Sequence, residues 1–185
     1  HALRPRSEPL LNSERIQQTF GSYDVEVLFQ DSTWRLSSLN SDSENNPTCR
    51  TFALVRFFIP IDSELVVEHR AITSGRSLGA TLRHYGWALE KNHLDYSQIT
   101  LHPSHVVLSL MNIEPACNLA AHRYVILAKK SSKLIRYAEI LEIHHPDHLS
   151  LRDIEQFYFP GRSDRRVEAR EHMHLLRSGV EPVSY

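Results

Sequence analysis

The sequence predicts an α+β domain with a mainly antiparallel sheet and flanking helices. Strand-like segments occur in pairs joined by short polar turns, and helical segments lie between those pairs. Strands joined by so short a connection pair antiparallel, and helices inserted between such pairs are typical of the α+β class. The chain has 185 residues, 41% of them hydrophobic, which suits one domain with a single core.

The chain is expected to open with a helix followed by a hairpin. Residues 13–20 form the helix, which Ser13 caps and Gly21 ends, since each residue type is favoured at that position. Residues 24–30 alternate apolar and polar side chains, which is typical of a strand with one buried face. Residues 33–39 are expected to be its hairpin partner.

A second strand and a helix are expected next. Residues 41–47 (SDSENNP) have strong turn chemistry and predict a polar loop. Residues 51–60 form a long strand that ends at a proline, and residues 63–72 form a helix capped by Ser63.

The middle of the chain predicts two short helices, then a hairpin. Residues 78–85 form a helix stopped by Gly86, and residues 103–111 form another with Pro103 near its start. Between them, 87–99 contains a strand at one end or both. The sequence then gives two strands around a Lys-Lys-Ser-Ser tip, at residues 119–128 and 134–143.

The end of the chain predicts two more helices. Residues 150–158 carry Ser150 and Asp153 at capping-box spacing. Residues 163–177 are strongly charged and predict either a solvated terminal helix or an arm for a partner subunit. We therefore divide the chain into an arm (1–12), a domain (13–150) and a helical extension (151–185).

Charged residues interrupt three strand faces that are otherwise apolar. Successive strand residues point to opposite sides of a sheet, so each charge should share a face with its apolar neighbours. Arg56 lies among Phe52, Leu54 and Phe58; Glu139 lies among Ile135, Tyr137, Leu141 and Ile143; Arg123 lies among Leu119, Ala121, Val125 and Leu127. Burying a charge is costly unless it is paired.

Two interpretations of these charges stay open. In one, Arg56 and Glu139 form a structural ion pair within the sheet. In the other, a pocket on one face uses an arginine to hold a carboxylate and a glutamate to supply a proton.

Composition excludes several functional classes. The net charge is −1, so no basic field points to nucleic acid or to an anionic membrane. No apolar run approaches the roughly 20 residues that a membrane-spanning helix needs. The chain begins with His1 rather than methionine, which leaves open a signal peptide ahead of it.

Cysteine and histidine spacings do not predict a metal site. Cys49 and Cys117 lack CxxC spacing, although a disulfide between them stays open. Most of the twelve histidines are scattered. The densest group, His144, His145 and His148, follows a strand, where a loop tolerates histidine, so no metal is expected.

Four segments resemble the chorismate lyase superfamily, which includes chorismate pyruvate-lyases and the UTRA effector domains of GntR-type regulators. The resemblance runs from about residue 13 to about residue 149, which is most of the chain. They are SERIQQTFGSYDVEVLFQ (13–30), the hairpin from TWRL (33–36) to CRTFALVRFFIP (49–60), RSLGATLRHYG (76–86) and AHRYVILAKKSSKLIRYAEILEI (121–143).

This resemblance implies specific roles for residues. Glu139 takes the position of the lyase's catalytic glutamate, and Arg35 that of the arginine that binds the product carboxylate, to within a residue or two. Arg56 matches a second arginine, while Leu78 and Gly79 match the backbone step that lines the pocket. Arg123, on the expected strand 119–128, and Tyr137, on the same expected strand as Glu139, are further candidates for ligand binding.

The sequence departs from the superfamily in three places. Nothing before Ser13 predicts a helix-turn-helix, so a GntR-type repressor is not expected. An alanine, Ala138, precedes Glu139 where the lyases place a small polar residue, and the segment after Leu149 has no counterpart.

Three functional hypotheses follow. The first is a carbon–oxygen lyase that eliminates pyruvate from chorismate to give 4-hydroxybenzoate, with Glu139 as the acid and no cofactor. The second is a non-catalytic UTRA-like module that binds a small carboxylate or aromatic metabolite. The third is an exported protein with a Cys49–Cys117 bridge. A lyase would be cytoplasmic, a protein with a cleaved signal peptide periplasmic or secreted, and a homodimer stays open.

Overall fold

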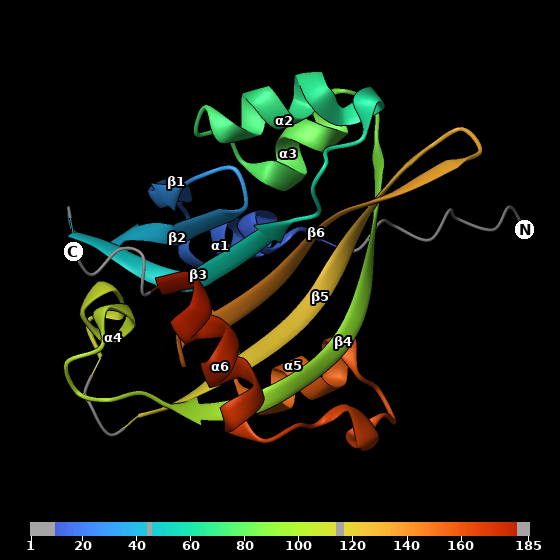
Figure 1. Cartoon of the computed structure of the whole chain (residues 1–185). Helices are drawn as coiled ribbons and strands as arrows, with labels where there is room; N and C mark the ends of the chain where they lie inside the picture. Colours follow the sequence, from blue (N-terminus) through green and yellow to red (C-terminus); the bar gives the residue numbers. More distant parts are fainter. Residues whose placement is uncertain (1–9, 44–45, 114–116, 181–185) are drawn as a thin grey trace, which may run out of the picture.

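The computed structural model describes residues 10–43, 46–113 and 117–180. Its main feature is a six-stranded sheet in the order β1-β2-β3-β6-β5-β4, with every neighbouring pair antiparallel. Helices pack on both faces (Figure 1), so the predicted α+β class is confirmed. The strands are β1 Asp24–Gln30, β2 Trp34–Ser43, β3 Asn46–Phe57, β4 Ala88–Thr100, β5 Asn118–Lys130 and β6 Lys133–His144.

The centre of the sheet is a long-range pairing. One half of the sheet consists of β1, β2 and β3, which hairpins connect. The other half consists of β4, β5 and β6, of which β5 and β6 form a hairpin. The two halves join where β3 pairs with β6. This register places Arg56 opposite Glu139. The loop predicted at 41–47 is wrong at its two ends, because β2 and β3 stay paired there, with Asp42 opposite Pro47. Residues 44–45 lie outside the described residues.

The helices follow the predicted order. They are α1 Asn12–Phe20, α2 Val66–Thr73, α3 Leu78–His84, α4 Val106–Met111, α5 Leu151–Tyr158 and α6 Ala169–Val180, with 3-10 turns η1 Ser63–Leu65 and η2 Ser163–Arg165. None of the described helices has both the length and the hydropathy that a membrane span requires.

The predicted helix ends are partly right. Gly21 ends α1 with a φ of 80°, and Ser150 and Asp153 form the predicted capping box of α5. The caps predicted at Ser13 and Ser63 are wrong. Helix α1 begins at Asn12, with Glu14 accepting the Leu11 N–H, and the carboxylate of Asp62 accepts the N–H at the start of η1.

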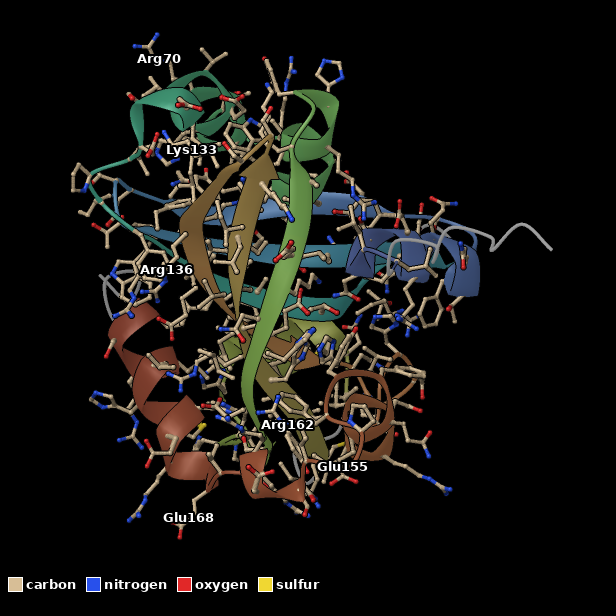
Figure 2. The ribbon with its side chains drawn as sticks, turned by 90° about the vertical axis from the view of Figure 1, so that its right-hand side faces the viewer. Arg70, Lys133, Arg136, Glu155, Arg162 and Glu168 are labelled. Atoms are coloured by element: carbon tan, nitrogen blue, oxygen red, sulfur yellow. The ribbon has the colours of Figure 1, made fainter. Side chains whose placement is uncertain are left out.

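The two faces of the sheet carry different helices. We call the side that packs against α4 and α6 the α6 face; its core includes Phe52, Leu54 and Leu141. The opposite side, which packs against α2 and α3, is the α2 face; its core includes Val55 and Ile140. Figure 2 shows α6 and α1 on opposite sides of the strands, and charged side chains such as Arg70 and Glu168 pointing outward.

The face predicted for β6 is half wrong. Glu139 does share the α6 face with Leu141, but Tyr137 belongs to the core of the α2 face. The register shows why: Ile126 pairs with Ala138, whereas Leu127 pairs with Arg136. Tyr137 is therefore an extra residue, a β-bulge, and the alternation changes phase there.

The C-terminal helix is not the solvated helix that one of the two predictions described, while the other, an arm for a partner subunit, stays a prediction. Helix α6 buries His172, Leu176 and Gly179 against the sheet, and Gly179 lies so close to Leu54 that an added Cβ would come within 2.3 Å of its Cδ1. The division into 1–12, 13–150 and 151–185 stays a prediction, and residues 1–9 and 181–185 lie outside the described part.

Both cysteines are free thiols, so the bridge between Cys49 and Cys117 is not formed. Cys49 is buried in β3, and burial raises the pKa of its thiol to about 11. A thiol with so high a pKa is mostly protonated at neutral pH and is a poor nucleophile.

Candidate functional site

The structure places the residues expected to form one site at three locations. Arg35, Leu78 and Gly79 line a cavity on the α2 face. Arg56, Arg123 and Glu139 lie together on the α6 face. Tyr137 lies on the α2 face, where its hydroxyl is 2.8 Å from Nδ1 of His69 on helix α2.

The α6 face carries a row of paired charges that we call the charge ladder. It crosses four strands to helix α6 and consists of Arg56, Glu139, Arg123, Asp95 and His172. Glu139 accepts hydrogen bonds from Arg56 and, at 3.1 Å, from Arg123. The second carboxylate, Asp95, is bonded to Arg123 and lies 2.7 Å from Nε2 of His172.

Every acid in the charge ladder has a basic partner on each side. Burial acts to raise the pKa of Asp95, but hydrogen bonds from His172 and Arg123 outweigh it and lower the pKa. The Arg56–Glu139 ion pair that the sequence left open is thus observed, and Arg123 extends it. The charge ladder is a closed network that connects the strands to α6.

The cavity lies on the other face, under the chain that leads into α3 and the start of α1. Its volume is about 80 Å³. Most of the surface of the cavity is apolar, from residues such as Leu39, Val55 and Ile126, but nine polar residues also line it. Those polar residues are Asn12, Ser13, Tyr23, Arg35, Ser37, Ser77, Lys91, Tyr124 and Glu142.

Arg35 is a buried cation at this cavity. Only 2% of the residue is exposed, and no carboxylate lies within 4 Å of it among the described residues. Its Nε donates to Ser37, and its Nη1 donates to the carbonyls of Ile72 and Arg76. No described residue accepts from Nη2, which leaves one arm of the guanidinium fork free to bind an anion.

Lys91 brings a second cation to the cavity. Its Nζ lies 4.5 Å from the centre of the Tyr124 ring, a cation–π contact, and it has no ion-pair partner among the residues described. Burial lowers the pKa of Lys91, and the nearby charge of Glu142 acts in the opposite direction. Burial also lowers the pKa of Arg35. Arg35 is buried and Lys91 is half-buried, and a buried cation without a carboxylate partner is costly.

Glu142 is the carboxylate of the cavity, and sequence reasoning missed it. Its Oε1 accepts a hydrogen bond of 2.9 Å from the hydroxyl of Tyr124, and its Oε2 has no partner among the described residues. The residue is 4% exposed. The available signal was that Glu142 alternates with Ala138 and Ile140 on the apolar α2 face, as Glu139 does on the other.

Several histidines lie beyond Glu142 on the same face. Burial lowers the pKa of His93 and of His148 to about 4 in each case, and it lowers the pKa values of His122 and His144 well below their usual range. The group His144, His145 and His148 does not converge: His148 contacts Asn12, whereas His145 accepts the N–H of Asp147.

The chain is similar to solved structures, although at low sequence identity. The chain resembles a transcriptional regulator of the GntR family from Enterococcus faecalis V583, with a TM-score of 0.43 and 11% sequence identity. The match covers 70% of this chain and 93% of that one. No family model matches the chain, and no curated protein matches it. A similarity of this level assigns neither a ligand nor a function.

Proposed function

We propose that the cavity binds a small metabolite that carries a carboxylate, and that the chain acts as a ligand-binding module. The observation that supports this is Arg35, a buried guanidinium with a free Nη2 and no acidic partner among the described residues. A planar fork of this kind pairs with a carboxylate, and the pairing would offset the cost of burying the cation.

The rest of the cavity defines the ligand further. Lys91 adds a second positive charge, while the apolar wall suits a ring or a short hydrocarbon body. Glu142 presents an acceptor without a donor, so the ligand should also carry a hydroxyl or amine. A cavity of about 80 Å³ suits a small molecule.

The test compares two ligands of nearly equal shape. Purified protein is titrated calorimetrically with 4-hydroxybenzoate and with 4-hydroxybenzamide, which lacks the charge. We expect binding of the acid only, and a loss of about 10- to 100-fold in affinity in Arg35→Met, since a hydrogen bond to a charged group contributes about 1.5–3 kcal/mol. Arg56→Met is the matched control and should bind like the parent. Equal affinity for both ligands would contradict the proposal.

A second candidate function is the lyase reaction implied by the sequence resemblance. The observation that favours it is a carboxyl group, Glu142, at the same cavity as Arg35. Glu139 is not carried into this candidate, because it lies on the opposite face and is already held by Arg56 and Arg123. In this mechanism Glu142 would donate a proton or hydrogen bond to the departing enolpyruvyl oxygen.

Turnover separates the two candidates. The protein is incubated with chorismate, and 4-hydroxybenzoate is followed by chromatography in the parent, Glu142→Gln and Glu139→Gln. Product that disappears only in Glu142→Gln would support the lyase with Glu142 as its acid. Product that disappears only in Glu139→Gln would return that role to Glu139. Binding without product supports the ligand-binding module.

A further inference from the structure

Three buried side chains form a compact cluster beside the cavity, on the α2 face. His122 is on β5, and Glu142 and His144 are on β6. The register places His122 opposite Glu142, and a spacing of two puts His144 on the same face as Glu142. Their exposed fractions are 0%, 4% and 0%.

The geometry of this cluster leaves lone pairs facing one another. Oε2 of Glu142 lies 3.7 Å from Nε2 of His122 and 3.7 Å from Nε2 of His144. Neither Oε2 of Glu142 nor Nε2 of His122 has a hydrogen-bond partner among the described residues. Buried polar atoms without partners are rare and costly, so each one needs an explanation.

Neighbouring groups orient two of the three side chains. The hydroxyl of Tyr124 occupies Oε1 of Glu142, which leaves Oε2 directed at the histidines. The far nitrogen of His144, Nδ1, lies 3.0 Å from Oγ1 of Thr51, which itself accepts from Asn12. Protein metal sites typically hold the second nitrogen of a histidine ligand and the second oxygen of a carboxylate ligand in this way.

We propose that His122, Glu142 and His144 form a binding site for a divalent transition-metal ion such as zinc. Two imidazoles and one carboxylate are a donor set that zinc accepts, with a fourth position left open. Tetrahedral zinc separates its ligand atoms by about 3.4 Å, so the two 3.7 Å edges would shorten by a few tenths of an ångström.

Metal binding would rearrange one existing contact and work against two charges. Nε2 of His144 now lies 3.0 Å from Nδ1 of His122, and the metal bond would replace that hydrogen bond. Arg15 and Lys91 are close enough to act on His144, and their charges repel a cation. Metals that form strong bonds to imidazole can overcome this repulsion, whereas calcium and magnesium, which prefer oxygen ligands, should not bind.

This site goes beyond the proposed ligand cavity and does not depend on it. The two share Glu142: without metal its Oε2 is the acceptor for the hydroxyl or amine of the organic ligand, and with metal the same oxygen is a ligand of the ion, which would lie against the wall of the cavity. Metal binding is therefore measured on protein without any organic ligand, and ligand binding on protein kept in chelator. A failure of either proposal then leaves the other intact.

The experiment measures zinc and cobalt binding to protein dialysed against a chelator. We expect one zinc ion per chain by elemental analysis after gel filtration, and a visible absorption of bound Co²⁺ typical of a tetrahedral site. His122→Gln, Glu142→Gln and His144→Gln should each lose at least roughly tenfold in zinc affinity. The controls, exposed His174→Gln and Glu90→Gln, should keep it.

Two results would overturn the proposal: no zinc retained by the parent protein, which would mean that water or a proton fills the gap, or equal retention by the parent and the three cluster variants. Circular dichroism checks that each variant folds. If His144→Gln does not fold, the Co²⁺ spectrum of the parent and the Glu142→Gln titration decide, and an octahedral spectrum counts against the site.

Discussion

The two faces of this sheet handle buried charge in opposite ways. On the α6 face, Glu139 and Asp95 each have a basic partner on both sides, and the charge ladder ends at helix α6. On the α2 face, Arg35 and Lys91 have no acidic partner among the described residues, and Glu142 keeps one oxygen without a donor. Arg56 and Arg35 lie on neighbouring strands, yet among the described residues only Arg56 has a carboxylate partner.

This contrast shows how a structural charge differs from a candidate functional one. In a paired network, the ion pairs within the fold offset the free-energy cost of desolvating the charges. Breaking the network should therefore lower the free energy of unfolding. For unpaired charges around a cavity, the cost of desolvation is offset only when a ligand binds. Mutations that break the charge ladder should thus lower the free energy of unfolding and leave ligand binding unchanged, whereas mutations of the unpaired cations at the cavity should weaken ligand binding.

The largest expected effect comes from breaking the charge ladder at its most buried acid. Asp95→Ala leaves His172, which is 1% exposed, and Arg123 without their shared carboxylate, and should lower the free energy of unfolding by about 3 kcal/mol. Urea denaturation measures it, with exposed Glu90→Ala as the control. Unchanged stability would show that the ladder contributes nothing to the fold.

Acid should destabilise the α2 face, because its histidines are buried in the neutral form. Burial lowers the pKa of His148 from 6.5 to about 4, so the unfolded chain binds more protons than the folded chain between those pH values. Stability is then full above pH 6.5 and falls as the pH drops toward 4, by up to about 3 kcal/mol for this group. His148→Gln should flatten the curve measured in chelator, and a parallel curve would contradict this.

The packing of α6 on its face can be tested with a single methyl group. A Cβ on Gly179 would come within 2.3 Å of Leu54, which is buried and cannot move away freely. Gly179→Ala should cost about 1–2 kcal/mol by overpacking, despite the better helix propensity of alanine. Thermal unfolding measures the loss. Arg177→Ala, on the exposed side of the helix, is the control, and a stabilised Gly179→Ala would show that α6 is loosely docked.

The smallest effect is expected at the rim of the cavity. A Cβ on Gly79 would lie 3.1 Å from two side-chain carbons of Leu11, so this side chain must shift by a few tenths of an ångström. Gly79→Ala should change stability by less than about 0.5 kcal/mol and weaken ligand binding by a few-fold. Calorimetry with 4-hydroxybenzoate measures the change. A tenfold loss would mean that Gly79 contacts the ligand directly.

The sequence by itself determined the class of the fold and much of the element order. Alternation and turn chemistry located β3 and the β5–β6 hairpin, and the capping box at Ser150 located α5. The signals for these elements are local, since they depend on residues a few positions apart. Arg35, Leu78 and Gly79 were candidates through the resemblance to the chorismate lyase superfamily, and the three line one cavity.

Tertiary structure alone decided which glutamate faces the cavity. Strand alternation correctly put Glu139 on the same face as Leu141, but nothing local in β6 shows which face carries Arg35. That depends on the pairing of β6 with β3, some 80 residues earlier in the chain. The bulge at Tyr137 depends in the same way on pairing with β5. Period-2 alternation gives relative direction within one strand, while the choice of face is set by long-range pairing and by the helices that pack on each side.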